Sequence, residues 1–213
     1  MSNRRLPVYL LIDTSGSMRG EPIQSVNVGL KSMVSALRQD PYAIESVSIG
    51  LITFDIEAKE IFPLTALDLV QIPEILVPDS GPTFLGAALE LLIQRSDIEV
   101  IKNTPSKKGD WRPLLFIMTD GSPTDLQTYR NMISEVKKRN FGNIVACAAG
   151  PKANESILKE LTDNVVHLDT TDSSTFAQFF KWVSASVSIG TSSAGVSEPT
   201  YLPPPPPEVQ MVI

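Results

Sequence analysis

Asp13, Ser15 and Ser17 place three oxygen-bearing side chains at every second residue of one short segment. They directly follow the apolar run 6–12, which is too short to span a membrane and is typical of a buried parallel strand. Ligands of open α/β sheets bind at the carboxyl ends of strands. Hard oxygen donors at that place suit a divalent cation such as Mg²⁺, which takes few carboxylates and keeps several waters. The segment therefore predicts a metal site.

Two further segments offer oxygens of the same kind. Thr83 lies in a loop rich in turn formers, and the apolar run 114–118 ends in Thr119-Asp120-Gly121. We expect the strands before Asp13 and Asp120 to be neighbours at the switch point of a sheet, which would bring both carboxylates together. Thr83 could instead cap the helix that follows it. Two carboxylates and three hydroxyls complete an octahedral shell only with water or a partner's carboxylate, so the site has room for an incoming acidic group.

The remaining sequence must position these loops, and it alternates strand-like and helix-like segments as βαβ units do. Pro63 suits an edge strand, which makes 47–64 a hairpin with an antiparallel edge. Pro41 is expected to close the first helix. The fold class is therefore α/β, a doubly wound, mostly parallel sheet of six strands with one antiparallel edge strand and helices on both faces. We expect strands at 6–12, 47–54, 59–64, 114–118, 144–149 and 165–168, and helices near 22–37, 85–93, 128–139, 154–161 and 176–187.

Composition favours a single domain with an ordinary core. The net charge of −6 argues against nucleic acid as a partner. Cys147 is the one cysteine, so an internal disulfide is excluded, and its apolar surroundings predict a core residue. Two arginines precede the first apolar run as in a signal peptide, but Asp13 stops that run and no cleavage pattern follows. We therefore expect a cytoplasmic protein without a membrane partner.

The character of the chain changes at residue 190. We predict one domain over residues 1–189, then a flexible Ser/Gly linker and a Pro-rich tail over residues 190–213. The tail could dock as an added strand or enter a proline-binding groove, and disorder is equally compatible with its composition. Glu208 could fill the metal site of another copy, which leaves tail-mediated self-association open.

The metal pattern resembles a known family. Asp13, Ser15 and Ser17 form an Asp-x-Ser-x-Ser motif that, with Thr83 and the Thr-Asp-Gly around Asp120, resembles the metal-ion-dependent adhesion site (MIDAS) of von Willebrand factor A (VWA) domains. The resemblance implies a Rossmann-like fold and a bound Mg²⁺ or Mn²⁺ completed by a protein ligand's carboxylate. It implies direct binding of the ion by the three hydroxyls, and direct or water-mediated binding by the two carboxylates. The implied function is a divalent-metal-dependent adaptor that grips an acidic residue of a protein partner.

This resemblance covers roughly residues 5–190. More narrowly, the stretch Arg5–Ile23, the segment 52–55 and the proline-rich end resemble the bacterial TerY branch of the family. That branch is associated with tellurite-resistance and stress-response systems. The resemblance therefore implies a partner such as a kinase or phosphatase of the same system.

The competing class is an enzyme, namely a metal-dependent phosphatase or other hydrolase that uses Asp13. A haloacid-dehalogenase-type phosphatase needs a second Asp two residues on, where this chain has Ser15. A serine hydrolase needs a histidine base, and the one histidine, His167, lies on another predicted strand with no paired acid evident. A glycine-rich phosphate loop with lysine is absent as well. We therefore predict a non-enzymatic protein without catalytic residues.

Four other residues invite a functional interpretation. Asp55 is at best an indirect support of the metal site, and an exposed hairpin residue is the better interpretation. Asp125 is interpreted as a solvated loop residue. Trp111 and Trp182 could anchor a partner, but core packing is the default for both.

Overall fold

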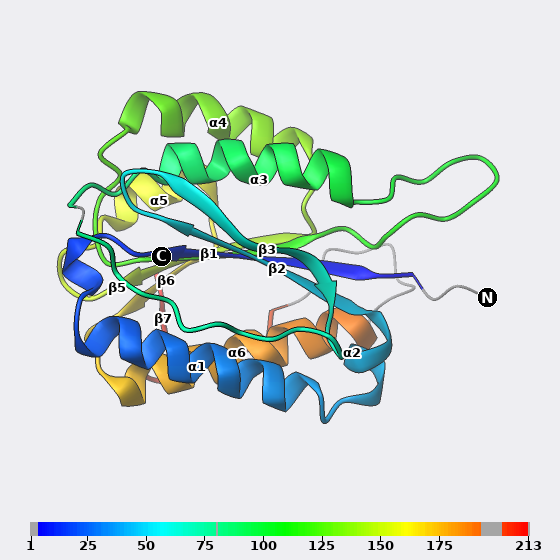
Figure 1. The fold of residues 1–213 in the computed structure, drawn as a ribbon, viewed down its shortest axis with the longest axis horizontal. Helices are drawn as coiled ribbons and strands as arrows, with labels where there is room; N and C mark the ends of the chain where they lie inside the picture. The colour runs from blue at the N-terminus through cyan, green and yellow to red at the C-terminus, as the bar shows by residue number, and fades with distance from the viewer. Residues whose placement is uncertain (1–3, 80, 193–201, 213) are drawn as a thin grey trace.

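The structure is a computed structural model that describes residues 4–79, 81–192 and 202–212. A seven-stranded sheet lies between two layers of helices (Figure 1). Its strands are β1 (Leu6–Asp13), β2 (Val47–Phe54), β3 (Ala58–Ala66), β4 (Leu114–Thr119), β5 (Asn143–Ala149), β6 (Val165–Leu168) and β7 (Gln210–Met211). Its α-helices are α1 (Glu21–Leu37), α2 (Pro41–Ser46), α3 (Leu85–Glu99), α4 (Leu126–Lys138), α5 (Glu155–Leu161) and α6 (Ser173–Ser192), and a short 3₁₀ turn, η1, spans Gly16–Met18.

The order of the strands creates a switch point in the middle of the sheet. That order is β3-β2-β1-β4-β5-β6-β7, so the chain builds outward from β1 in one direction and later from β4 in the other. β1 pairs in parallel with both β2 and β4, whereas β3 and β7 are antiparallel at the two edges. The predicted mostly parallel α/β sheet and its antiparallel β2–β3 edge are confirmed.

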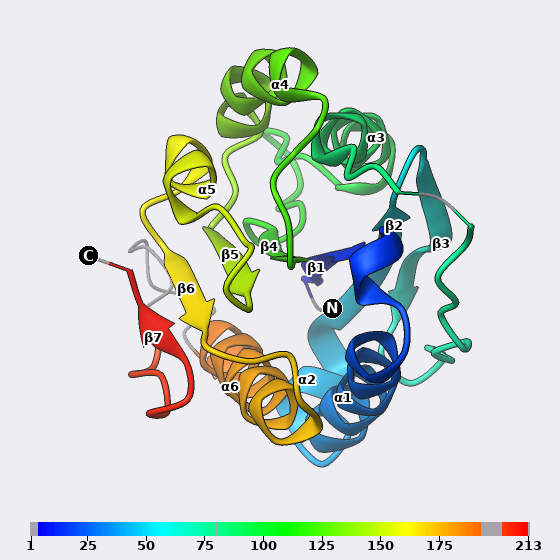
Figure 2. The same cartoon turned by 90° about the vertical axis from the view of Figure 1, so that its left-hand side faces the viewer.

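Helices cover both faces of the sheet, as Figure 2 shows: α1, α2 and α6 lie on one side and α3, α4 and α5 on the other. Each layer has its own apolar core. β1 is buried at every position because it is covered on both faces, which is why its sequence is apolar throughout instead of alternating. α1 and α6 pack so closely that a Cβ on Gly29 would overlap the ring of Phe180. None of the described helices combines the length and apolarity that a membrane crossing needs.

The expected number of six strands is wrong, because the tail adds a seventh. Val209 is 1% exposed, and the Trp182 indole donates a hydrogen bond of 2.9 Å to the carbonyl oxygen of Pro203. These contacts hold Gln210 and Met211 against β6, where they pair with His167 and Val166. Two paired residues are too few to produce a periodic pattern in the sequence. Tertiary packing therefore decides between the alternatives of added strand and disorder.

The linker expected from residue 190 begins inside a helix, since α6 continues to Ser192. Residues 193–201 lie outside the described part of the chain. Pro41 also differs from its expected role: the first helix ends at Leu37, and Pro41 begins α2. The Asp40 side chain caps α2 by accepting hydrogen bonds from the amides of Tyr42 and Ala43. Proline is favoured at the first helical position because its missing N–H has no partner there anyway.

Cys147 and Trp182 lie in the core, as expected, and burial raises the pKa of the Cys147 thiol. Trp111 is partly buried and packs against the same core, also as expected. The guanidinium of Arg4 lies 3.6 Å from the centre of its ring, a cation–π contact. Trp111 thus joins the core to the surface just before β4.

Candidate metal centre

The predicted metal-binding residues gather at the carboxyl ends of β1 and β4. Ile12 is in register with Met118, so Asp13 and Asp120 both lie at the carboxyl end of the parallel strands. Figure 2 faces this end of the molecule. Thr14 ties the loop after β1 to β2, because its amide donates a 2.8 Å hydrogen bond to the carbonyl oxygen of Phe54. The chain then turns through η1, which brings Ser17 back over the sheet end.

Asp13 is completely buried and is held by neutral donors. Its Oδ1 accepts a 2.7 Å hydrogen bond from the Ser15 amide, and its Oδ2 accepts one of 2.6 Å from the Thr119 hydroxyl. Burial raises the pKa of Asp13 to about 6, against the effect of these hydrogen bonds, and repulsion from Asp120 adds to the rise. A buried carboxylate in this condition is stabilised by any cation that reaches it.

Asp120 and the two serines form a connected set of oxygens. The Ser17 hydroxyl donates a 2.7 Å hydrogen bond to Asp120 Oδ1 and lies 3.3 Å from the Ser15 hydroxyl. Asp120 is 7% exposed, and burial raises its pKa although Ser17 and the charge of Lys152 oppose the rise. Ser17 itself is exposed, so the set is open to solvent on that side.

Thr83 is placed beside Asp120 by contacts between two loops. Its amide donates a 3.1 Å hydrogen bond to the Thr124 hydroxyl, and its carbonyl oxygen accepts one of 2.9 Å from the Thr124 amide. Its own hydroxyl lies 3.4 Å from the point that a Cβ on Gly121 would occupy. The alternative that Thr83 caps α3 is wrong, since the cap position is Phe84.

Sequence reasoning missed the residues that hold this arrangement together. Asp125 is not a solvated loop residue: it accepts hydrogen bonds from the amides of Gly86 and Ala87 and so fastens α3 to the loop after β4. Asp55 is not an exposed hairpin residue, since it is 3% exposed and accepts a 3.2 Å hydrogen bond from the Thr14 hydroxyl. A polar residue at the end of a buried strand was the available signal for Asp55, and for Thr119 as well.

The donor set fits a hard divalent cation. Two nearly buried carboxylates lie together, and no cationic side chain of the described residues forms an ion pair with either of them. The described residues hold no group of three or more His, Cys, Asp and Glu side chains suited to a metal. A cation here would therefore rely on hydroxyl oxygens and water besides the two carboxylates, as Mg²⁺ sites commonly do.

A hollow beside the site leaves space for an incoming group. It has a volume of about 230 Å³ and is lined by Ser17, Asp120, Thr171 and the segment 149–152. Gly150 in this segment has a φ of +80°, a conformation that suits glycine. Lys152 lies at the rim and contributes the one positive charge among the lining residues.

The geometry gives the hydrolase alternative little support. Asp13 has no exposed surface, and both of its oxygens accept hydrogen bonds. Contrary to expectation, His167 does have acidic neighbours: its Nδ1 lies 2.6 Å from Glu155 Oε1 without hydrogen-bonding geometry, and its Nε2 lies 3.5 Å from Asp169 Oδ1. The hydroxyls of the two serines contact each other and Asp120 instead of this histidine.

Solved structures with the same fold come from diverse proteins. Proximal thread matrix protein 1 from the mussel byssus has a TM-score of 0.67 at 19% identity, covering 85% of this chain and 48% of its own. The pilus adhesin SpaC from Lactobacillus rhamnosus GG, in an open conformation, gives 0.68 at 13% identity, covering 90% and 31%. The ArnB paralog VWA2 from Sulfolobus acidocaldarius gives 0.61 at 18% identity, covering 87% and 46%.

These similarities establish the fold, and this chain spans less than half the length of each of the three proteins. The mussel protein is also known in a form with a zinc-occupied MIDAS motif, to which this chain is 20% identical with a TM-score of 0.59.

Among curated proteins, none matches this chain in sequence. The family model of the von Willebrand factor type A domain, in contrast, matches residues 8–182, which include every residue of the candidate metal centre. The match covers most of the chain and agrees with the observed sheet order and with the solved structures. This chain belongs to the von Willebrand factor type A domain family.

Proposed function

We propose that this protein is a divalent-metal-dependent protein-binding module. The observation that carries the proposal is the pair Asp13 and Asp120, two carboxylates brought together at the end of the sheet without an ion pair to any cation of the described residues. Mg²⁺ or Mn²⁺ would be held by Ser15, Ser17 and Thr83 directly, and by the two carboxylates directly or through water. Zinc is a further candidate because a structurally similar protein holds it in its MIDAS motif.

The bound ion would supply a positive charge that attracts an acidic group of the partner. The protein's own residues position the site. Thr124 bonds to Thr83, Asp125 bonds to the start of α3 just after it, and Asp55 bonds to Thr14 in the loop after β1. The hollow lined by Ser17 and Asp120 admits the partner's side chain. The proposed partner is therefore a protein that presents an aspartate or glutamate.

Calorimetric titration of Mg²⁺, Mn²⁺ and Zn²⁺ into metal-free protein tests the metal site. We expect heat from the wild type and none from Asp13→Ala, because Asp13 has no other described cation to neutralise it. Asp163→Ala serves as the matched control, since it removes one carboxylate from the loop between α5 and β6. Equal heat from all three proteins would place the metal elsewhere and overturn the assignment.

The proposal includes the absence of catalysis. Its support is the burial of Asp13, which leaves this carboxylate no open path to a substrate. The metal-loaded protein should not hydrolyse p-nitrophenyl phosphate above the rate of the Asp13→Ala variant. Turnover that disappears in this variant would favour the phosphatase alternative.

The biological setting is proposed from sequence resemblance alone. The stretch Arg5–Ile23 and the segment 52–55 support a bacterial, cytoplasmic tellurite-resistance or stress-response system, with a kinase or phosphatase of that system as partner. Metal-loaded protein used as bait in such a cell, with metal-free protein beside it, tests this setting. Capture of an acidic-surface kinase or phosphatase only with metal is the expected result.

Tail-mediated self-association is a further part of the proposal. Glu208 is exposed next to β7, so its carboxylate is available to the metal site of a second copy. Light scattering in the presence of Mg²⁺ should then show dimers that Glu208→Gln abolishes. Dimers that persist in Glu208→Gln or after chelation would have another origin.

A further inference from the structure

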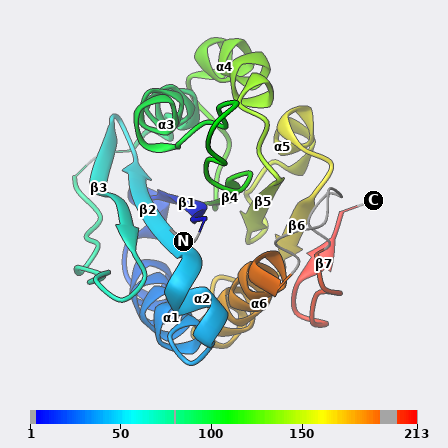
Figure 3. The ribbon, with the colours of Figure 1, turned by 90° about the vertical axis from the view of Figure 1, so that its right-hand side faces the viewer.

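A second cavity, of about 700 Å³, opens at the end of the sheet opposite the metal centre. It lies where α3 and α4 end and where β4 begins, and its lining includes Val100, Ile101, Lys102, Arg112 and Phe141. Figure 3 looks onto this end of the molecule. The length of β1 separates it from the metal centre by roughly 25 Å, at about 3.3 Å for each residue of a strand. Cavities of this volume are typical of specific binding sites.

The cavity has an apolar part that a ligand can reach. Phe141 forms a buried portion of the wall, while Ile101 is 48% exposed and Val100 is half-buried. Trp111 adds a partly buried aromatic ring whose face is occupied by Arg4. These residues offer an apolar side chain a place to pack.

A firmly anchored loop borders the cavity. The segment 100–113 connects α3 to β4 and projects from the body of the protein (Figure 1). At its base, Asp110 accepts hydrogen bonds from Arg5 at 2.7 and 3.1 Å and from the Ile101 amide at 2.8 Å. A Cβ on Gly109 would overlap the carbonyl oxygen of Ile101, so the two sides of the loop lie in direct contact. The base of the loop is therefore built to hold one shape.

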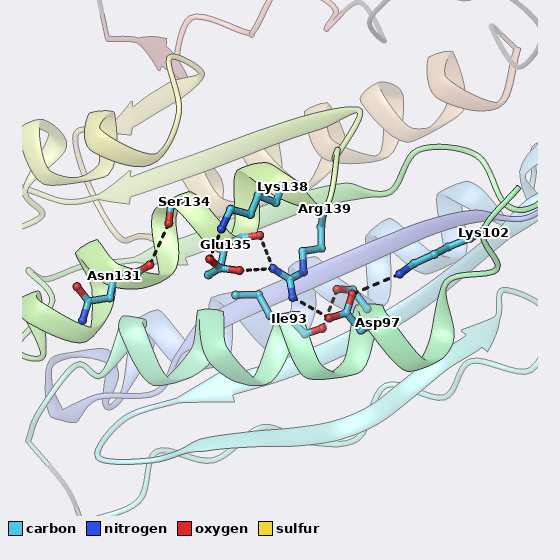
Figure 4. A network of polar contacts seen from close by, with 9 residues as sticks. Ile93, Asp97, Lys102, Asn131, Ser134, Glu135, Lys138 and Arg139 are labelled. Carbon is cyan, nitrogen blue, oxygen red and sulfur yellow. Dashed lines mark hydrogen bonds and ion pairs between the residues drawn. The ribbon is translucent and has the colours of Figure 1, made fainter.

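Two positively charged side chains around the cavity already form close ion pairs. Arg139 bridges Asp97 and Glu135 at 2.8 and 2.7 Å, and Lys138 contacts Glu135 at 2.6 Å (Figure 4). Both also lie at the carboxyl end of α4, where positive charge is favourable to the helix dipole. These two residues need no ligand to explain them.

Lys102 and Arg112 are less fully paired. Lys102 has an exposed side chain, and its ion pair with Asp97 is a long one, at 3.9 Å. Arg112 donates hydrogen bonds to the carbonyl oxygens of Asn140 and Phe141, which fix its position without neutralising it. Lys107 and Lys108 add two exposed charges on the loop, with no ion pair to another described residue. Positive side chains thus border the apolar part of this cavity, in a protein whose net charge is −6.

We propose that this cavity is a metal-independent docking site for an acidic protein segment that carries an apolar side chain. The apolar residue packs against Ile101 and Phe141, and flanking carboxylates pair with Lys102, Arg112 and Lys108. A long polyanion such as RNA fits less well, since the acidic remainder of the surface repels it. The site goes beyond the proposed metal function and does not depend on it. Two sites at opposite ends of one sheet would let the protein hold two partners at once.

A fluorescein-labelled synthetic peptide of aspartates and glutamates around a central phenylalanine is the probe, read by fluorescence polarisation. The double variant Lys102→Glu/Lys108→Glu should weaken its binding at least about tenfold, because Lys102 lines the cavity and Lys108 is an exposed charge of the loop that borders it. The matched control Lys31→Glu/Lys181→Glu makes the same charge change at exposed lysines elsewhere and should bind within twofold of the wild type. Replacing the peptide's phenylalanine by serine should also weaken binding.

Chelation with EDTA should leave peptide binding unchanged, whether or not the metal function holds. Absence of binding up to about 1 mM peptide would overturn the proposal. So would an equal loss in the control variant, or equal binding of the serine peptide. An oligouridylate or an anionic lipid vesicle that competes at lower concentration than the peptide would likewise replace the proposed partner with another class.

Discussion

Asp13 and Asp110 are buried carboxylates at opposite ends of the central strands, and they are neutralised in different ways. Asp110 is 8% exposed, and its two oxygens receive the guanidinium of Arg5 and the amide of Ile101. Asp13 is fully buried, yet its donors are the hydroxyl of Thr119 and an amide, both neutral. The same chemical group is therefore satisfied from within the protein at one end and left short of a positive charge at the other.

The two carboxylates differ in what compensates their burial. The hydrogen bonds that Arg5 donates to Asp110 raise the pKa of Arg5, because the ion pair favours the charged form of the guanidinium. At Asp13 burial raises the pKa of the carboxylate itself, because the charged form has too little compensation. Perturbed acids of the second kind gather at sites that bind something. Burial of an acid does not by itself indicate a site, since Asp55 is 3% exposed and supports the loop after β1.

The largest effect on stability is expected from removing Asp110, the carboxylate that is paired with Arg5. Asp110→Ala leaves Arg5 and the Ile101 amide without their acceptor, and should lower the free energy of unfolding by about 2–3 kcal/mol, since Arg5 remains about a third exposed. Urea unfolding at neutral pH measures this loss. Glu57→Ala removes one partner of the exposed pair with Lys59 and should cause little change. Equal stability of the two variants would mean that the Asp110 pair holds nothing in place.

The next effect is on metal binding at the carboxyl ends of β1 and β4. Asp120→Ala should weaken Mg²⁺ binding on the order of 100-fold while the metal-free protein keeps its fold, because the hydrogen bond that Asp120 would lose comes from exposed Ser17. Calorimetry measures the affinity, and far-ultraviolet circular dichroism measures the helical content. A marked loss of helical signal without metal would show that Asp120 is structural after all.

The raised pKa of Asp13 should make both Mg²⁺ affinity and stability depend on pH. Protons and Mg²⁺ compete for Asp13, whose pKa is about 6, so the affinity for Mg²⁺ should fall about tenfold for each pH unit below 6. In the metal-free protein the sign is reversed: the raised pKa of Asp13 stabilises the fold at pH below about 4, and this contribution is lost as the pH rises through 6. An affinity that is constant between pH 5 and 7 would contradict the first expectation.

The smallest effect is expected when Asp13 and Asp110 are each replaced by asparagine. Asp13→Asn removes an uncompensated charge, so without metal at pH 8 it should raise the free energy of unfolding by about 1 kcal/mol. Asp110→Asn should lower it, because the amide cannot neutralise Arg5. Denaturant titrations of the two variants beside the wild type decide the signs. Two changes of the same sign would remove the distinction drawn between the two acids.

Most of the fold is predictable from local patterns. The apolar runs of β1 and β4 lie on strands covered on both faces, and Pro63 marks the antiparallel edge. β7 was open to either interpretation, because its two paired residues depend on contacts with Trp182 and β6, which are remote in the sequence. Pro41 shows the same limit on a smaller scale: proline ends one helix and begins another equally well.

The oxygen-bearing residues of the candidate site could be predicted from the sequence, but the contacts that hold their loops in place could not. Asp13 and Asp120 lie together because β1 and β4 are neighbours, which the switch-point rule anticipates. Asp125 holds the start of α3 through the amides of Gly86 and Ala87, and loop-to-helix contacts of this kind follow no periodicity. The ion pairs around the second cavity likewise connect α3 with α4 across a long stretch of chain.

The position of β7 in the chain has a consequence for biosynthesis. Every other strand of the sheet precedes it, so a nascent chain can assemble the parallel core while the segment that closes the edge is still inside the ribosome. During that interval the outer edge of β6 exposes unpaired backbone amides and carbonyls. Other nascent chains translated from the same mRNA can then pair with them. Chaperone demand during translation should therefore be greatest just before residues 209–212 emerge.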